Sequence, residues 1–236
     1  MDKSNDQKIT ILVDGPYQVS GGITLNRATI VCDDSGVSVA WEVSEAFPTP
    51  GESYNLCRCG HSQKRPYCDG NHRARGFKGR EKAGRPPYTA SAKRRQGPQV
   101  DLLDDPSLCV GARFCDRGPT VWRLVENGRD NESLKMAVEE ACACPAGRLT
   151  IVDSQGQLLE PELPLEISLV EDPANNCRGP LWVKGGVPME GKGGDQYETR
   201  NRVSLCRCGE SANMPYCDAS HYDCPHMREL DERPAI

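Results

Sequence analysis

The sequence predicts a β-rich α+β fold made of two similar units, with a small α+β insert between them. Three observations predict this architecture. A stretch with the spacing C-x-C-x8-C-x3-H occurs twice, at residues 57–72 and 206–221. Short runs rich in β-branched residues, separated by turn residues, precede the first copy. The segment between the copies has a different cysteine pattern and one amphipathic helical pattern.

The repeat extends beyond the cysteines. The run Gly-Pro-Tyr-Gln-Val-Ser-Gly-Gly-Ile at 15–23 matches Gly-Pro-Leu-Trp-Val-Lys-Gly-Gly-Val at 179–187, and each run is followed by Leu-Cys-Arg-Cys-Gly. The repeated unit is therefore a β-element plus a cysteine loop. We divide the chain into a first unit (1–100), a middle segment (101–155) and a second unit (156–236).

Five short runs in the first unit are rich in Val, Ile and Thr and are separated by Gly, Pro and Asp. They predict strands at 9–13, 17–19, 23–25, 28–32 and 37–41. Residues 44–53 are expected to form a loop. Residues 73–100, rich in Arg, Gly and Pro, are expected to form a connector without regular structure.

The spacing within each cysteine loop bears on the metal that it binds. Tetrahedral zinc usually takes its cysteine pairs at C-x2-C to C-x4-C, and C-x-C is tighter than that. A [2Fe–2S] cluster divides the ligands over two irons, so Cys57 and Cys59 can hold one iron while Cys68 and His72 hold the other. The spacing favours iron–sulfur, with zinc or an unliganded structural cysteine group as the alternatives.

Both loops resemble the CDGSH iron–sulfur motif of the mitoNEET family. The copies end Cys-Asp-Gly-Asn-His and Cys-Asp-Ala-Ser-His, and each departs from the family pattern at one position without losing a ligand. Family members bind one [2Fe–2S] cluster per motif through three cysteines and one histidine. Carried over by position, the ligands are Cys57, Cys59, Cys68 and His72, and Cys206, Cys208, Cys217 and His221.

The resemblance also implies a fold. The mitoNEET-like relatives are homodimers whose two copies share a β-cap. Two units in one chain therefore imply mitoNEET-like β-cap and cluster-loop units that pair within one polypeptide. Ala219 occupies the position of Gly70, so a positive φ is not expected to be compulsory there.

The middle segment carries another cysteine pattern. Cys109 and Cys115 frame a C-x2-C-x2-C pattern with Ala112 in the middle, and Cys144 before a proline supplies a distant ligand. Residues 104–153 resemble divergent single-cluster ferredoxins. Three ligands imply a [3Fe–4S] cluster, whereas Cys142 as a fourth would give [4Fe–4S]. A ferredoxin-like remnant with buried free cysteines is the remaining alternative.

The middle segment is expected to contain a strand at 121–125, a helix at 132–142 and a closing strand at 149–152. The other cysteines in the chain, and two histidines, are not expected to be ligands. Residues 223–236, polar and proline-bearing, are expected to form a loose tail. The cysteines and histidines that are not expected to be ligands are Cys32, Cys177, Cys224, His61 and His226.

The composition of the chain indicates where the protein is located and which partners it can have. The chain has thirteen cysteines, no signal-peptide character at its N-terminus and no run of the roughly 20 apolar residues that span a bilayer. We therefore expect a reducing cytoplasm and no membrane partner. Residues 58–95 hold twelve Lys or Arg and two acids, although the net charge of the chain is −5.

That basic stretch predicts docking of an acidic redox protein or of an apo iron–sulfur acceptor. The alternative is a merely solvated face, and no nucleic-acid partner is expected. No hydrolytic triad, phosphate-binding loop or pair of catalytic acids stands out, so we expect a carrier rather than an enzyme. The predicted function is electron transfer, with cluster delivery, repair or redox sensing, or an electron-transfer subunit of an oxidoreductase, as alternatives.

Overall fold

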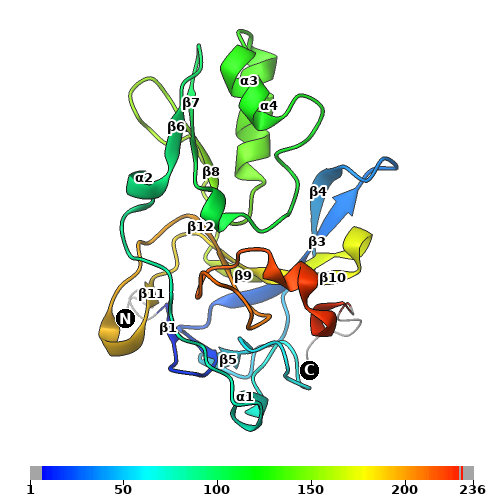
Figure 1. The fold of residues 1–236 in the computed structure, drawn as a ribbon, viewed down its shortest axis with the longest axis vertical. Coiled ribbons are helices and arrows are strands. Elements are labelled where there is room, and N and C mark those ends of the chain that lie inside the picture. The colour runs from blue at the N-terminus through cyan, green and yellow to red at the C-terminus, as the bar shows by residue number, and fades with distance from the viewer. Residues whose placement is uncertain (1–6, 229, 231–236) are drawn as a thin grey trace.

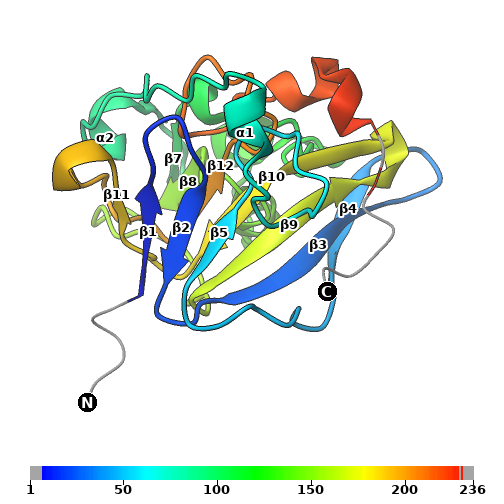
Figure 2. The same ribbon diagram turned by 90° about the horizontal axis from the view of Figure 1, so that it is seen from below.

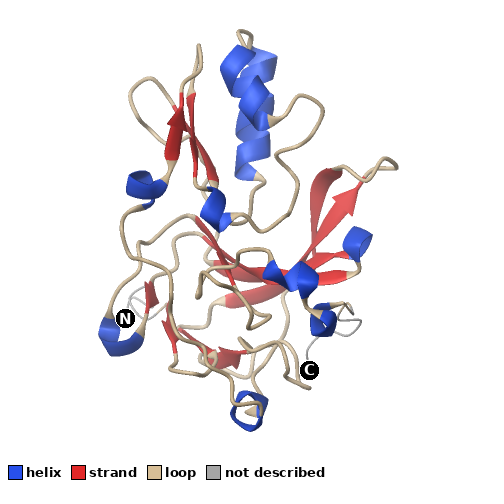
Figure 3. Ribbon diagram, in the orientation of Figure 1, coloured by secondary structure: helices blue, strands red, loops and turns tan. Residues whose placement is uncertain are grey.

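The computed structural model describes residues 7–228 and 230. The described residues form three β-sheets and few helices, and the two longest of these helices lie together at one end (Figures 1 and 3). The overall class is α+β and β-rich, as predicted. Among the described residues, no helix is long and apolar enough to cross a membrane.

Two sheets form the larger part of the molecule. Their strand orders are β11-β1-β2-β5 and β12-β10-β9-β3-β4. Residues along β1 and β2 alternate between buried and partly exposed positions, as the period of a strand packed on one face requires. The strands are β1 (Lys8–Ile11), β2 (Tyr17–Ser20), β3 (Thr24–Cys32), β4 (Ser38–Val43), β5 (Tyr54–Leu56), β9 (Glu166–Asp172), β10 (Cys177–Lys184), β11 (Met189–Glu190) and β12 (Arg202–Leu205).

The first and second halves of the chain exchange strands. Strand β1 pairs in parallel with β11, and β9 pairs in parallel with β3, so each sheet contains a strand from the other half. Figure 2 shows β3 lying directly beside β9. One hydrophobic core contains Tyr17 and Leu25 from the first half together with Ile167 and Leu205 from the second. The two halves therefore share a core instead of folding around separate ones.

The middle segment lies at one end of the molecule, where two helices pack against the third sheet, β6-β7-β8 (Figure 1). The residues that cover this sheet include Val121, Leu124 and Ala141, all buried. The helix at 132–142 and the strand at 149–152 are as predicted. The elements are α2 (Tyr88–Ser91), β6 (Lys93–Arg95), β7 (Asp101–Asp104), η2 (Pro106–Leu108), α3 (Val121–Asn127), α4 (Asn131–Cys142) and β8 (Leu149–Val152).

The strand predicted at 121–125 is wrong, because these residues form α3. The run is rich in β-branched and aromatic residues, which favour strands. Thr120, however, caps a helix by accepting a hydrogen bond from the backbone N–H of Arg123 at 3.5 Å. Burial at Val121, Leu124 and Val125 follows the helical spacing, so packing against α4 decides the conformation.

Three smaller expectations also need correction. The runs at 23–25 and 28–32 belong to the single strand β3. Residues 73–100 are not wholly irregular, because they contain α2 and β6, and β6 pairs with β7. The loose tail predicted at 223–236 is wrong for its first part, because η6 (Pro225–Met227) packs Met227 into the interior, where it is 1 % exposed. Residues 229 and 231–236 of that tail lie outside the described residues. The other short helices are α1 (Asn71–Ala74), η3 (Pro173–Asn175), η4 (Lys192–Gly194) and η5 (Ser220–Asp223).

Candidate metal centres

Each cysteine loop begins where a strand of the shared core ends. Strand β5 ends at Leu56 and β12 ends at Leu205, immediately before the first cysteine. The loop then folds back on its own start, because the N–H of Cys57 donates to the carbonyl of Pro66 and the N–H of Cys68 to that of Asn55, at 2.8 and 2.9 Å. This return brings the third cysteine beside the first two.

The second loop closes in the same way. The N–H of Cys206 donates to the carbonyl of Pro215 at 2.8 Å, and the N–H of Cys217 donates to the carbonyl of Ser204 at 2.9 Å. A serine braces both loops from inside: Ser211 Oγ donates to the carbonyl of Tyr216 at 2.7 Å, as Ser62 does in the first loop to that of Tyr67 at 2.6 Å.

The acid after the third cysteine has a structural role in both copies. Asp69 accepts hydrogen bonds from the backbone N–H groups of Gln63 at 2.8 Å and Asn71 at 3.0 Å. Asp218 accepts from the N–H of Ala212 at 2.7 Å and of Ser220 at 3.1 Å. Each carboxylate therefore joins the middle of the loop to the turn that carries the histidine.

The backbone of that turn differs from expectation. Gly70 has φ 88°, and Ala219 at the same position of the second loop has φ 71°. The inference that positive φ is not required there is wrong, because the alanine adopts the left-handed conformation in spite of its Cβ. The hydrogen bonds of Asp218 on both sides of the turn help to hold this conformation.

The candidate ligands of each loop lie in two pairs. The Sγ atoms of Cys57 and Cys59 are 3.8 Å apart, and Cys68 Sγ lies 3.3 Å from Nδ1 of His72. Two thiolates bound at about 2.3 Å to one tetrahedral metal ion lie about 3.8 Å apart, so each pair has the separation of two ligands on one metal. We call these four residues the first site.

The second site has the same arrangement. The Sγ atoms of Cys206 and Cys208 are 3.5 Å apart, and Cys217 Sγ lies 3.3 Å from Nδ1 of His221. Within the described residues, no group of three or more His, Cys, Asp or Glu side chains is arranged to hold a single ion. The donor set therefore fits a group that offers one metal to each pair.

The two sites differ in burial. His72 is 9 % exposed and Cys68 is half-buried, whereas His221 and Cys217 are each 2 % exposed. Burial lowers the pKa of His221 to about 4, and it lowers the pKa of His72 as well. Both imidazoles are therefore neutral near neutral pH, which is the form that binds a metal.

The middle segment brings three of its four cysteines into one neighbourhood, which we call the middle site. Burial raises the pKa of Cys115 to about 12, and the nearby thiols of Cys144 and Cys109 add to that rise. Cys142 faces elsewhere, because its thiol donates to the carbonyl of Leu159 at 3.4 Å. Helix α4 ends at Cys142, and Cys144 follows two residues beyond its last residue.

The turn between these two cysteines is fixed by a buried arginine. Arg202, with no exposed side-chain area, donates to the carbonyls of Ala141 at 2.6 Å, Cys142 at 3.1 Å and Cys144 at 2.8 Å. A cation on the last carbonyls of a helix is favourable, since these oxygens have no partner within the helix. The second unit thus positions the distant cysteine of the middle site.

Comparison with known protein families decides the class of these sites. The family model described as iron-binding zinc finger, CDGSH type, matches residues 14–73 and 178–222. A model described as a divergent 4Fe-4S mono-cluster matches residues 95–154. Two CDGSH-type iron-binding domains flank a divergent 4Fe-4S segment in this chain. No curated protein and no solved structure gives a significant match.

The matched ranges contain all twelve candidate ligands, Cys142 included. The first CDGSH domain begins at residue 14 and therefore includes β2 to β5, and the second includes most of β10 as well as β12. The 4Fe-4S segment begins at residue 95, at the end of β6, six residues before the boundary expected at 101.

The loops of the two CDGSH domains pack against each other. A Cβ at Gly209 would lie 2.9 Å from the carbonyl oxygen of Cys59, and a Cβ at Gly60 would lie 2.8 Å from that of Cys208. Only glycine allows this approach. Tyr17 of the first domain also donates through its hydroxyl to the carbonyl of Cys206 at 2.8 Å.

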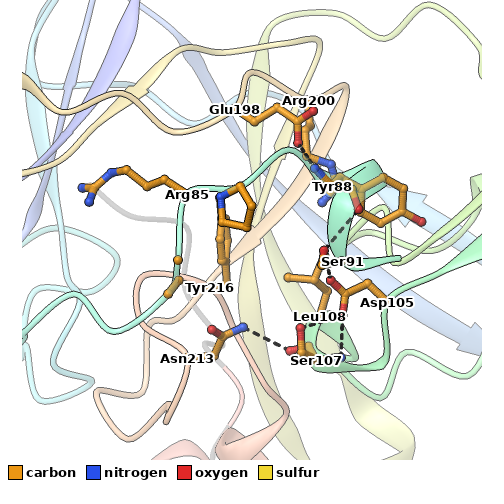
Figure 4. A pocket seen from close by; sticks show the side chains of 13 residues that line it. Arg85, Tyr88, Ser91, Asp105, Ser107, Leu108, Glu198, Arg200, Asn213 and Tyr216 are labelled. Atoms are coloured by element: carbon orange, nitrogen blue, oxygen red, sulfur yellow. Dashed lines mark hydrogen bonds between the residues drawn. The ribbon is translucent and has the colours of Figure 1, made fainter. Parts of the chain in front are cut away.

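The second CDGSH loop also meets the 4Fe-4S segment. Cys217 packs in one hydrophobic cluster with Val110, Ala112 and Phe114, which places the second site beside the loop between Cys109 and Cys115. A cavity of about 130 Å³ is lined mainly by residues of the connector 83–91 and by Glu198 and Arg200, with Ser107 and Asn213 also in its wall (Figure 4). There the side-chain amide of Asn213 donates to the carbonyl of Ser107 at 3.2 Å.

Several residues around the second site carry no strong signal in the sequence. The thiol of Cys177 donates to the carbonyl of His221 at 3.4 Å, and that of Cys224 donates to the carbonyl of Ser220 at 3.2 Å. His226 Nε2 lies 2.9 Å from the carbonyl of Cys208, and its ring packs 4.3 Å from that of His61. These side chains lie around the ligand loops, and Cys32 lies instead near Ser38 and Arg113.

The basic stretch 58–95 divides into two parts. Lys64, Arg73 and Arg75 are exposed next to the first site. Arg94 and Arg95 lie away from it and pair with Asp101 and Glu126 of the 4Fe-4S segment.

Proposed function

We propose that this protein is an electron-transfer protein that holds one [2Fe–2S] cluster in each CDGSH domain and one [3Fe–4S] cluster in the middle segment. The observation that carries the proposal is the pairing of the ligands, with 3.8 and 3.3 Å at the first site and 3.5 and 3.3 Å at the second. A single zinc ion would need four donors around one point. Two pairs suit two irons.

The residues supply the ligands and set the chemistry. Cys57 and Cys59 would hold one iron of the first site, and Cys68 and His72 the other; Cys206 and Cys208, and Cys217 and His221, would do the same at the second. When bound, such a cluster accepts and releases one electron. A neutral imidazole in place of a thiolate leaves less negative charge around the irons, which raises the potential.

The middle site is assigned three ligands, Cys109, Cys115 and Cys144. The position of Cys142, whose thiol bonds the carbonyl of Leu159, supports [3Fe–4S] over [4Fe–4S]. Cys142→Ser tests the assignment. We expect the EPR signal and the iron content of the middle site to be unchanged, and a lost or altered signal would make Cys142 a ligand.

We further propose that the mitoNEET-like pairing is made within one chain. The parallel pairing of β1 with β11 and of β3 with β9 supports this, because each pair joins a strand of the first half to a strand of the second. The hydrogen bond of Tyr17 to the second loop supports it as well. The expected partner is an acidic redox protein that docks on the exposed cations beside the first site. A reducing compartment such as the cytoplasm suits thirteen cysteines, none of which is in a disulfide.

Metal analysis of the purified protein tests the proposal. Anaerobic, iron-replete expression should give a coloured protein with about seven iron atoms per chain and little zinc. EPR spectra of the oxidised and reduced forms should show one [3Fe–4S] signal and two [2Fe–2S] signals. A colourless protein with stoichiometric zinc would overturn it.

Delivery of a cluster to an apo-protein is the second candidate function. The lower burial of the first site favours it, because Cys68 is only half-buried and is therefore partly open to solvent and to an acceptor. Mixing the loaded protein with an apo-ferredoxin and following visible absorbance separates the two functions. Transfer within minutes indicates delivery, whereas reversible reduction without loss of iron indicates electron transfer.

A further inference from the structure

We propose that Tyr222 is a positioning residue that couples the second site to the middle site, by holding the ring of His221 against the loop between Cys109 and Cys115. This inference rests on the proposed function, because it concerns how two of the proposed clusters are placed relative to each other. It adds a route inside the protein: the middle site communicates with the second site and, through it, with the first.

The first step is the contact with the ligand itself. The rings of Tyr222 and His221 lie 4.3 Å apart at an angle of 36°, so the tyrosine covers one face of the imidazole. Both residues belong to η5, and His221 is 2 % exposed. Rotation of the imidazole away from Cys217 would therefore displace the tyrosine ring.

The second step is the contact of Tyr222 with the middle loop. Its hydroxyl donates to Asp172 Oδ2 at 2.8 Å and lies 3.1 Å from the carbonyl oxygen of Gly111. Gly111 has φ +73°, and a Cβ there would lie 2.5 Å from Cε2 of Tyr222. The loop between Cys109 and Cys115 thus approaches the tyrosine as closely as a glycine permits.

The third step is the network that fixes the hydroxyl. Arg113 donates to both carboxylate oxygens of Asp172, at 2.7 and 3.1 Å, to the carbonyl of Gly111 at 3.0 Å and to Tyr222 Oη at 3.2 Å. The Asp172 side chain is 1 % exposed and that of Arg113 is 32 % exposed, so the carboxylate is shielded from water while the guanidinium is partly open to it. Arg113 also has a positive φ of 63°, a conformation that a non-glycine residue adopts rarely.

The first CDGSH domain has no such contact among its described residues. The residue after His72 is Arg73, which is exposed and lies in α1 at the opposite end of the ligand loops from the middle segment (Figure 1). In Figure 1 the second loop, in orange and red, lies between the middle segment in green and the first loop in cyan. The close approach of Gly209 to Cys59 and the packing of Cys217 with Val110 and Ala112 agree with that order.

We call Tyr222 and its contacts with His221, Gly111, Asp172 and Arg113 the clamp. The clamp is expected to keep the second and middle sites at a fixed, short separation. Electron exchange between two centres falls steeply with their separation, and so does the interaction between their electron spins. The ring of Tyr222 sets the separation through packing, and its hydroxyl sets it through the network with Asp172 and Arg113.

Tyr222→Leu, which removes both ring and hydroxyl, is the main test, and Tyr222→Phe retains the ring. Arg73→Leu at the equivalent position of the first domain is the matched control. The readout is the microwave power at half-saturation of the second-site EPR signal with the middle site paramagnetic. We expect a fall of about tenfold in Tyr222→Leu, a smaller fall in Tyr222→Phe and no change in Arg73→Leu.

A second readout does not depend on the metal centres. Amide hydrogen exchange at residues 109–115 should be faster in Tyr222→Leu and in Asp172→Asn than in Arg73→Leu. Unchanged half-saturation and exchange in Tyr222→Leu, or equal changes in Arg73→Leu, would overturn the inference. Absence of iron from the unsubstituted protein would instead overturn the proposed function. If Tyr222→Leu does not fold, Tyr222→Phe and Asp172→Asn decide by the same two measurements.

Discussion

The two CDGSH sites share their ligand spacing, their serine and aspartate braces and the separation of their ligand pairs, but they differ in what surrounds them. The first loop runs into α1 and the exposed residues 73–76. The second loop runs into η5 and η6, which bury Cys224 and Met227 against it, and the middle segment covers its other side. One motif thus forms a less buried site and an enclosed one.

The difference arises in the residues that follow each histidine. Arg73 and Arg75 stand in the first domain at the positions of Tyr222 and Cys224 in the second. Charged side chains keep the first turn in water, whereas the thiol of Cys224 is buried and the ring of Tyr222 is half-buried. The ligands set the kind of centre, and their neighbours set its exposure.

The largest difference that we expect between the two sites is in the loss of stability when a ligand cysteine is removed. Cys217 is 2 % exposed and packs with residues of the middle segment, so Cys217→Ser leaves an unfilled site inside the core. Cys68 is half-buried, and water can replace a lost metal there. We expect Cys217→Ser to destabilise the protein by about 3 kcal/mol more than Cys68→Ser, or about 10 °C in melting temperature.

Differential scanning calorimetry of the two variants measures this difference. Cys32→Ser, which changes no ligand, serves as the control and should melt near the unsubstituted protein. Equal melting temperatures for the two ligand variants would show that enclosure of the second site contributes nothing to its stability.

Replacement of each histidine by cysteine tests the electrostatic side of the comparison. A thiolate adds a negative charge to the site, so reduction becomes harder and the potential falls at both sites. The charge is less screened by water at the second site. We expect a fall of roughly 200 mV for His221→Cys and roughly 100 mV for His72→Cys, measured by EPR-monitored redox titration. Equal shifts of the reduction potential in the two variants would mean that burial does not affect the potentials of these sites.

Charge reversal beside the first site tests whether it is the docking face. The double substitution Arg73→Glu with Arg75→Glu should slow association with an acidic [2Fe–2S] ferredoxin about tenfold at low salt. The matched control is Arg129→Glu with Lys135→Glu, which makes the same change of net charge at the far end of the molecule (Figure 1). Stopped-flow traces that slow equally in both pairs would argue against docking at the first site.

The ligand loops could be predicted from the sequence because a metal centre constrains residue type and spacing within a few positions. The repeated Gly-Pro and Leu-Cys-Arg-Cys-Gly runs also mark the two similar units. The helix at 132–142 was recognisable from its periodicity, since its apolar residues follow the helical spacing. These features depend on local sequence alone.

What the sequence did not reveal depends on contacts between distant residues. Residues 121–125 have strand propensity, yet packing on α4 makes them helical. The burial of Met227 and the clamp at Tyr222 involve partners about 50 to 110 positions away, such as Asp172 and Gly111. The left-handed conformation of Ala219 is imposed by the loop around it, and alanine itself gives no sign of it.

The smallest expected effect concerns that alanine. A Cβ at Gly70 would meet nothing within 4 Å, so Gly70→Ala changes only the conformational preference of the backbone. We expect Gly70→Ala to cost about 1 kcal/mol and Ala219→Gly to stabilise the protein by about 0.5 kcal/mol, since glycine relieves the strain but loses more entropy on folding. Guanidinium unfolding of the two variants, compared with the unsubstituted chain, gives both values. If Gly70→Ala lowers the free energy of unfolding and Ala219→Gly raises it, the second loop holds Ala219 in a conformation that alanine disfavours. If neither substitution changes the free energy of unfolding, neither turn stores strain.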